Sequence, residues 1–223
     1  MQADFSVELG AEDETLTLPW SAPEERLRFY DLRRHPELLL YVNEATLHRE
    51  LGEFLVGVNS QMSRLQTAKC DAWFSTKLEE EEAIYGASCK FISYVDLFFV
   101  EREARLALPR HQQIVDRLTR LLKRAPDISA AAEFVIRRCF YEPGAPSESA
   151  PAAETSLPAS DSPPNANDVQ EGFYITSYLF GYGDDEADAR RRWGIGLKLV
   201  ENAILQVSAE RPAEDPGTDT PAV

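Results

Sequence analysis

The chain has few of the residues that build metal sites, disulfide frameworks or transmembrane spans. It holds three cysteines and three histidines, and none of them stands at the short spacing that zinc ligands usually show. We therefore predict no metal site and no cofactor. Cys70, Cys89 and Cys139 are expected to be free, buried thiols, and the histidines to lie at the surface or at helix ends.

Long apolar segments are also absent. The longest apolar run, Leu38–Val42, is far too short to cross a bilayer, and no basic region followed by an apolar stretch begins the sequence. These two absences predict a cytoplasmic protein.

Positive charge is scarce as well. The 23 lysines and arginines face 38 aspartates and glutamates, which gives a formal net charge of −15. Binding to nucleic acid or to an anionic membrane needs clustered cations, so we predict neither nucleic acid nor membrane as a partner. The acidic composition is compatible with a basic protein partner.

The sequence does contain a weak internal repeat of strand, strand and helix. The first copy spans residues 65–124 and the second spans residues 133–207. The two copies share little literal identity, so a true duplication and two ordinary ββα units both fit.

The second copy is interrupted by residues 143–168, which hold six prolines, no aromatic residue and one large aliphatic residue, Leu157. Such a composition cannot bury enough apolar surface to offset the ordering of the chain. We predict a disordered insert over residues 143–168 and a disordered tail over residues 208–223. The remainder of residues 1–207 is expected to form a single domain.

Residue periodicity predicts the other elements. Residues 2–20 alternate in a strand-like way and indicate an N-terminal hairpin or two edge strands. From Pro36 the spacing becomes helical, with either a break near Thr46 or two short helices in series. The last helix, capped by Asp184 or Asp185, carries an apolar stripe of Trp193, Leu197, Val200, Ile204 and Val207.

The predicted fold class is therefore α+β. We expect an antiparallel sheet covered on one face by about three helices, with two consecutive ββα units and an N-terminal hairpin. In order of elements alone, this arrangement resembles the small acidic chaperone and regulator folds that bind partner polypeptides as dimers. The resemblance implies a protein partner or a homodimer.

The candidate site is a charged and aromatic patch on the first repeat. Strand alternation places Asp71 and Trp73 on one face of the first strand, and Lys90, Tyr94 and Asp96 on one face of the second. Two carboxylates beside an aromatic wall can support acid–base chemistry, but they also fit an exposed face of paired charges. We therefore assign these five residues as binding candidates and assign no catalytic residue. The acidic loop Glu79–Glu82 is expected to stay solvated.

Aromatic residues on the inferred strands suggest how such a protein would act. If the sheet face away from the helices is partly open, some of these side chains form a binding surface. The leading hypothesis is a non-enzymatic, soluble binding or regulatory protein that acts through protein–protein contacts. The alternative is a small-molecule-binding module or an enzyme, with a site between sheet and helices around Asp71, Trp73 and Asp96. The aromatic residues in question are Trp73, Tyr94, Phe98, Tyr141, Tyr174 and Tyr178.

Overall fold

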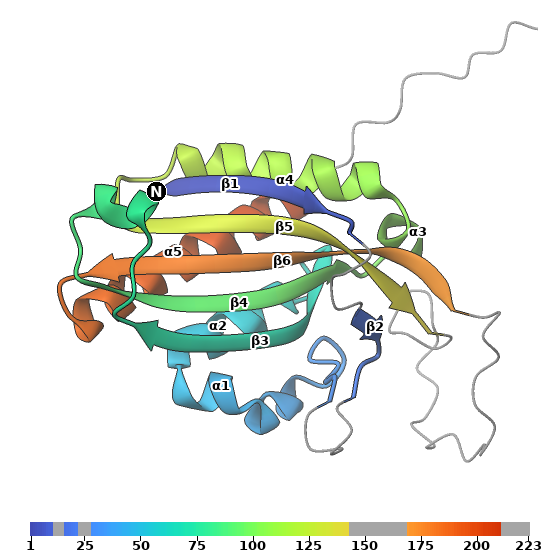
Figure 1. Ribbon diagram of the computed structural model, residues 1–223. Coiled ribbons are helices and arrows are strands. Elements are labelled where there is room, and N and C mark those ends of the chain that lie inside the picture. Colours follow the sequence, from blue (N-terminus) through green and yellow to red (C-terminus); the bar gives the residue numbers. More distant parts are fainter. Residues whose placement is uncertain (11–15, 22–27, 143–168, 211–223) are drawn as a thin grey trace, which may run out of the picture.

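A mixed sheet with helices against it organises the protein (Figure 1). The computed structural model describes residues 1–10, 16–21, 28–142 and 169–210. The strand order within them is β1-β5-β6-β4-β3, with the short β2 also beside β5. The strands are β1 (Gln2–Glu8), β2 (Leu16–Leu18), β3 (Leu65–Ser75), β4 (Cys89–Phe99), β5 (Ala130–Tyr141) and β6 (Gln170–Gly183).

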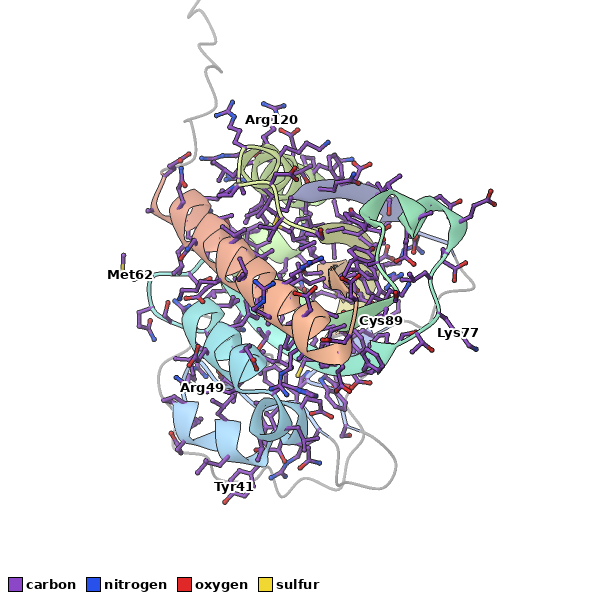
Figure 2. All side chains as sticks on the ribbon, turned by 90° about the vertical axis from the view of Figure 1, so that its left-hand side faces the viewer. Tyr41, Arg49, Met62, Lys77, Cys89 and Arg120 are labelled. Atoms are coloured by element: carbon purple, nitrogen blue, oxygen red, sulfur yellow. The ribbon has the colours of Figure 1, made fainter. Side chains whose placement is uncertain are left out.

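The longer helices cover one face of this sheet. In Figure 1, α5 lies behind the strands, α4 runs along the top beside β1, and α2 lies beside α5. Figure 2, which views the molecule from the side, shows η2 and Lys77 on the side of the sheet opposite to α5. The helical segments are η1 (Pro36–Tyr41), α1 (Asn43–Leu47), α2 (Arg49–Val58), η2 (Glu80–Tyr85), α3 (Arg102–Arg105), α4 (Leu108–Lys123) and α5 (Glu186–Ala209). The prediction of an α+β protein with a sheet and several helices is confirmed.

The antiparallel sheet and the N-terminal hairpin were wrong predictions. β1 runs parallel to β5 with Gln2 opposite Ala131, and β2 runs parallel to the same strand with Leu16 opposite Cys139. The two N-terminal strands therefore follow one another along β5 and do not pair with each other. An edge strand shows the same apolar alternation whichever direction its partner runs, so the pattern of residues 2–20 carries no information on direction.

The strand pairs β3–β4 and β5–β6 are antiparallel, and each pair precedes helices in the chain. β4 lies between β3 and β6, and every residue of it except Tyr94 is buried. Such burial on both faces explains why this segment is apolar on both sides.

Helix α5 packs its apolar stripe on the sheet. Trp193 is fully buried, and its indole Nε1 donates a hydrogen bond of 2.9 Å to Oγ of Ser93 on β4. The side chain of Asp185 caps the helix by accepting from the backbone N–H of Asp188 at 2.8 Å. The helix continues through Ala209, so residues 208 and 209 are helical and do not belong to a disordered tail. Residues 211–223 and the predicted insert, 143–168, lie outside the described residues.

Glycines in β6 allow α5 to approach the sheet closely. A Cβ on Gly181 would collide with the backbone of Ala189 and Trp193, and one on Gly183 would collide with the backbone of Ala189. Any side chain at these positions would force the helix away from the strand. The run Gly181–Gly183 thus serves helix packing.

Two histidines lie at the helix layer. His48 lies at the junction of α1 and α2, with its ring against those of Phe91 and Trp193. His111 lies in the first turn of α4, one of the two predicted positions, but it is fully buried and not at the surface. Burial lowers the pKa of His111 to about 4, so its imidazole is neutral at physiological pH. Among the described helices, none has both the length and the apolar character that a membrane span requires.

Candidate functional site

A cleft of about 1030 Å³ lies on the sheet face that the long helices leave free. Its floor consists of side chains from β3, β4, β5 and β6. Its walls come from residues 16–21 and 28–32, around β2, and from residues 41–44 at the end of η1 and the start of α1, and Leu55 of α2 also borders it. Ligand sites in proteins are typically concavities of about 300–1000 Å³, so this one is large for the class.

The walls of the cleft are anchored by a second apolar cluster on this face. Leu16 and Leu18 of β2 pack with Phe98, Tyr141 and Tyr174 of the sheet. The indole Nε1 of Trp20 donates a hydrogen bond of 2.9 Å to the carbonyl of Ala68 on β3. The segment around β2 is therefore a packed part of the site.

Asp96 is the most deeply buried acid in the cleft lining, with only 6% of its surface exposed. The hydroxyl of Thr176 donates a hydrogen bond of 2.7 Å to its Oδ1. Burial raises the pKa of Asp96 to about 6, although Thr176 and the charges of Lys69 and Arg137 act in the opposite direction. A carboxylate held in this way has few interactions that stabilise its charge.

Arg137 and Thr176 belong to the site but were not among the predicted residues. The guanidinium of Arg137 donates to the hydroxyl of Thr176 at 3.1 Å and to that of Tyr178 at 3.2 Å, and it forms a 2.9 Å ion pair with Glu8. On β6 the alternate residues Tyr174, Thr176 and Tyr178 share this face. Extending the strand alternation from Tyr174 to Tyr178 would have found Thr176.

Three of the five predicted residues, Asp71, Tyr94 and Asp96, line the cleft. The carboxylates do not stand directly opposite each other, because Asp71 pairs with Tyr94 and the register shifts between Thr67 and Cys70. Trp73 lies at the margin, 40% exposed, with its ring centroid 6.5 Å from that of Tyr94.

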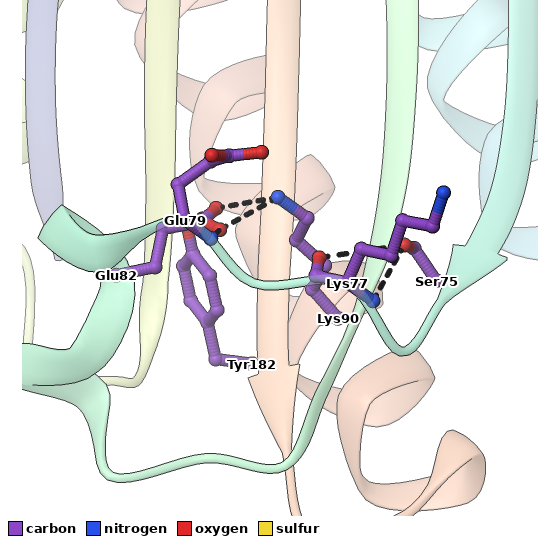
Figure 3. A network of polar contacts seen from close by, with 6 residues as sticks. All are labelled: Ser75, Lys77, Glu79, Glu82, Lys90 and Tyr182. Atoms are coloured by element: carbon purple, nitrogen blue, oxygen red, sulfur yellow. Dashed lines mark hydrogen bonds and ion pairs between the residues drawn. The ribbon is translucent and has the colours of Figure 1, made fainter.

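The fifth predicted residue, Lys90, lies at another end of the face and is bound to η2 (Figure 3). Its Nζ contacts the two carboxylate oxygens of Glu82 at 2.7 and 2.8 Å, and the hydroxyl of Tyr182 donates to the same carboxylate at 2.8 Å. The backbone N–H of Glu79 also donates to Glu82, at 2.7 Å. Glu82 is therefore not solvated as the sequence predicted, and Lys90 is separate from the cleft.

These positions also correct the location given for the alternative site. Asp71, Trp73 and Asp96 were predicted to border a site between sheet and helices. They lie on the face opposite to α5, with Trp73 in ring contact with Tyr94 and Asp96 bonded to Thr176. Among the described residues, those in helices border the cleft only through η1, α1 and α2, at Tyr41, Asn43, Glu44 and Leu55.

The cysteines are free thiols in the structure. Cys89 and Cys139 are buried, and Cys70 is partly buried at the cleft. Burial raises the pKa of both Cys70 and Cys139 to about 12, so neither is an activated nucleophile at neutral pH. Within the described ranges, no group of three or more metal-ligating side chains converges.

Comparison with known proteins gives no further guide to this cleft. The chain matches no protein-family model, and no curated protein or solved structure is significantly similar to it.

Proposed function

We propose that this is a non-enzymatic binding protein that holds a segment of a partner polypeptide in the cleft on the open sheet face. The observation that best supports this proposal is the composition of the lining. It contains tyrosine and tryptophan side chains together with arginine and hydroxyl groups. Tyrosine, tryptophan and arginine are enriched at the centres of protein interfaces, because each combines a large apolar surface with a polar tip. The aromatic lining residues are Trp20, Tyr30, Tyr41, Tyr94, Tyr174 and Tyr178.

The shape of the cleft supports a polypeptide occupant. Its floor crosses four strands, and its volume of about 1030 Å³ exceeds what most small ligands fill. Tyr94 and Tyr178 are only partly buried, with ring centroids 6.3 Å apart, so an incoming chain has apolar surface to cover. Their phenol groups offer hydrogen bonds to a peptide backbone.

The cleft draws on both ββα units. Asp71 and Tyr94 come from residues 65–124, and Arg137 and Thr176 from residues 133–207, while Trp20 comes from the N-terminal segment. A site assembled in this way supports the inference that residues 1–207 act as one domain. Whether the units arose by duplication does not affect this argument.

One observation favours a second candidate, a small-molecule module or an enzyme. Asp96 is a buried carboxylate with a raised pKa in a cleft, which is a common feature of acid–base sites. The neighbouring phenols of Tyr94 and Tyr174 have pKa values raised by burial and by the charge of Asp96, so they stay protonated at neutral pH and cannot accept a proton there. Recognition is therefore the better account of this carboxylate.

The test is a selection of random peptides against the full chain, followed by affinity measurements on variants. Peptides that bind the wild type should lose at least tenfold in affinity on Tyr94→Ala and on Tyr178→Ala. They should keep their affinity on Ile195→Ala, which removes an exposed side chain of α5 on the other face. Peptides that are insensitive to both tyrosine variants, or no selectable peptide at all, would reject the proposal.

A second copy of the chain is a competing occupant. If the protein is a dimer in light scattering, and Tyr178→Ala makes it monomeric, then the cleft is a self-association surface. That result would overturn a foreign polypeptide as the partner.

A further inference from the structure

The cations and the acids that line the cleft differ in the partners that the protein gives them. Arg137 is paired with Glu8 at 2.9 Å, and Lys69 lies over the ring of Trp20 with its Nζ 5.1 Å from the centroid. Arg28 lies over the ring of Tyr30 at 5.5 Å. Each of the three cations in the lining therefore already has a partner in the protein.

The acidic side chains of the same lining differ from these cations in their interactions. Over the described part of the chain, none of them forms an ion pair, although ion pairs are frequent elsewhere on the protein. The lining acids therefore lack a direct ion-pair partner among the described residues, although Lys69 and Arg137 lie near enough to Asp96 to act on its charge. These acids are Glu44, Asp71, Asp96 and Glu142.

Asp96 is the acid for which this matters most. It is 6% exposed, and only its Oδ1 receives a hydrogen bond from a described residue, Thr176. Removing a carboxylate from water is costly unless a cation or several donors replace the lost hydration. A positively charged group that reaches Oδ2 of Asp96 would supply the ion-pair partner that the described residues do not provide.

Two tyrosines flank this carboxylate on the same sheet face. Tyr94 is two residues before Asp96 on β4, and Tyr174 is two residues before Thr176, which stands opposite Asp96 on β6. In line with this placement, burial and then the charge of Asp96 raise the pKa of Tyr94, and the same two causes raise that of Tyr174 to about 12. Ring faces attract cations, most strongly where water is excluded. The cleft already uses this chemistry internally, where Lys69 lies over Trp20 and Arg28 over Tyr30.

We propose that the cleft recognises a lysine or arginine side chain of the bound polypeptide, with Asp96 as its counter-ion and the rings of Tyr94 and Tyr174 beside it. This inference rests on the proposed function and adds the chemistry of the partner. The protein's formal net charge of −15 acts in the same direction, because it attracts a basic segment from a distance.

The three tryptophans provide a direct test. Trp20 lines the cleft, whereas Trp193 is fully buried on the helix side and bonded to Ser93. In the full, ¹⁵N-labelled chain, the indole N–H signals can be followed by NMR during titration with blocked amino acids. The probes are the N-acetyl methylamides of lysine, arginine, norleucine and glutamate.

The lysine and arginine probes should move the indole signal of Trp20 and leave that of Trp193 unchanged. Norleucine, which matches lysine in length without its charge, should need at least tenfold higher concentration for the same shift. The advantage of lysine over norleucine should fall at least fivefold on Asp96→Asn. It should persist on Glu133→Gln, which neutralises an exposed acid of β5 that is not in the lining.

Acidification gives an independent readout. Because protonated Asp96 cannot act as a counter-ion, the preference for lysine over norleucine should decline as the pH falls from 7 to 5. The decline should be absent in Asp96→Asn.

Several results would overturn this inference. They are equal binding of norleucine and lysine, stronger binding of glutamate, an unchanged preference in Asp96→Asn, or no shift of Trp20 with any probe. The peptide selection separates this failure from that of the proposed function. Selected peptides that need Tyr178 but lack basic residues would reject the cation site and retain the polypeptide cleft.

Discussion

The ring of Tyr85 in η2 stacks on the ring of Tyr182 in β6, with centroids 3.9 Å apart and planes 9° from parallel. Next to this stack, Glu82 holds both Lys90 and the hydroxyl of Tyr182. The loop between β3 and β4 is thus fastened to the open face by one aromatic contact and one largely buried ion pair.

We expect Glu82→Gln to lower the free energy of unfolding by about 1.5–3 kcal/mol, the usual value of hydrogen bonds to a charged group. The substitution leaves Lys90 without its counter-ion in a site that water reaches poorly. Urea unfolding measures the effect. The exposed neighbour Glu81→Gln is the matched control and should change stability by less than about 0.5 kcal/mol.

The same ion pair predicts a dependence on pH. Burial acts to raise the pKa of Glu82, but the hydrogen bonds from Lys90, Glu79 and Tyr182 outweigh it and leave the pKa below its usual value. A carboxylate with a lowered folded-state pKa contributes stability above its unfolded-state pKa and loses it as the pH falls through the folded-state pKa. Stability should therefore drop less between pH 5 and pH 3 in Glu82→Gln than in the wild type. Parallel curves for the two proteins would contradict this assignment.

Asp96 predicts the opposite sign. Its folded-state pKa of about 6 lies above the ordinary value of 3.8, so its charge is a cost above pH 6 that disappears as the pH falls toward 4. Since one pKa unit corresponds to about 1.4 kcal/mol, Asp96→Asn should raise the free energy of unfolding at pH 8 by about 1–3 kcal/mol. The gain should vanish near pH 4. A variant less stable than the wild type at pH 8 would show that the carboxylate is a structural requirement.

Two isoleucines of α5 test its packing. Ile204 is fully buried, whereas Ile195 is 41% exposed. Ile204→Ala should cost about 2–5 kcal/mol by removing buried methyl groups, and Ile195→Ala should cost less than about 1 kcal/mol. Acrylamide quenching of the emission of Trp193 should increase only when the helix detaches. Similar stabilities of the two variants would mean that α5 is not an integral layer of the fold.

Residues 143–168 should be removable. Tyr141 of β5 stands opposite Gln170 of β6 in an antiparallel pair, so a short turn can connect the strands. Shortening a loop changes its closure entropy by about 0.6 kcal/mol for each halving of length. The variant in which a four-residue turn replaces 143–168 should keep a cooperative thermal transition within a few degrees of the wild type. Loss of that transition would make the segment part of the core.

Helix α5 and strand β4 were predictable because their evidence is local. The spacing of Trp193, Leu197 and Val200 fixes the buried stripe of a helix within a few turns, and the apolar residues on both sides of β4 indicate a central strand. The position of β1 was not predictable. Its partner is more than 120 residues away, and the residues between β1 and β2 look like a turn.

The candidate site was predictable only where the consecutive strands β3 and β4 carried it. Tyr94 and Asp96 share a face of β4 by alternation, Asp71 of β3 pairs with Tyr94, and all three line the cleft. Arg137 and Thr176 joined them through tertiary pairing of β5 and β6, which depends on register across the sheet. The contact between Glu82 and Lys90 escaped prediction because four consecutive acids suggest a solvated loop, and only the fold brings a lysine to one of them.

The parallel pairing of β1 with β5 has a consequence for how the chain reaches its fold. Residues 2–8 leave the ribosome well before residues 130–141, so β1 stays without this partner until β5 has been made. Until then, β3 and β4 can form their own antiparallel hairpin, while β1, with its alternating apolar residues, remains unpaired. Completion of the sheet edge should therefore be the slow, late event in folding, and the nascent N-terminal strand is the segment most exposed to mispairing with other chains.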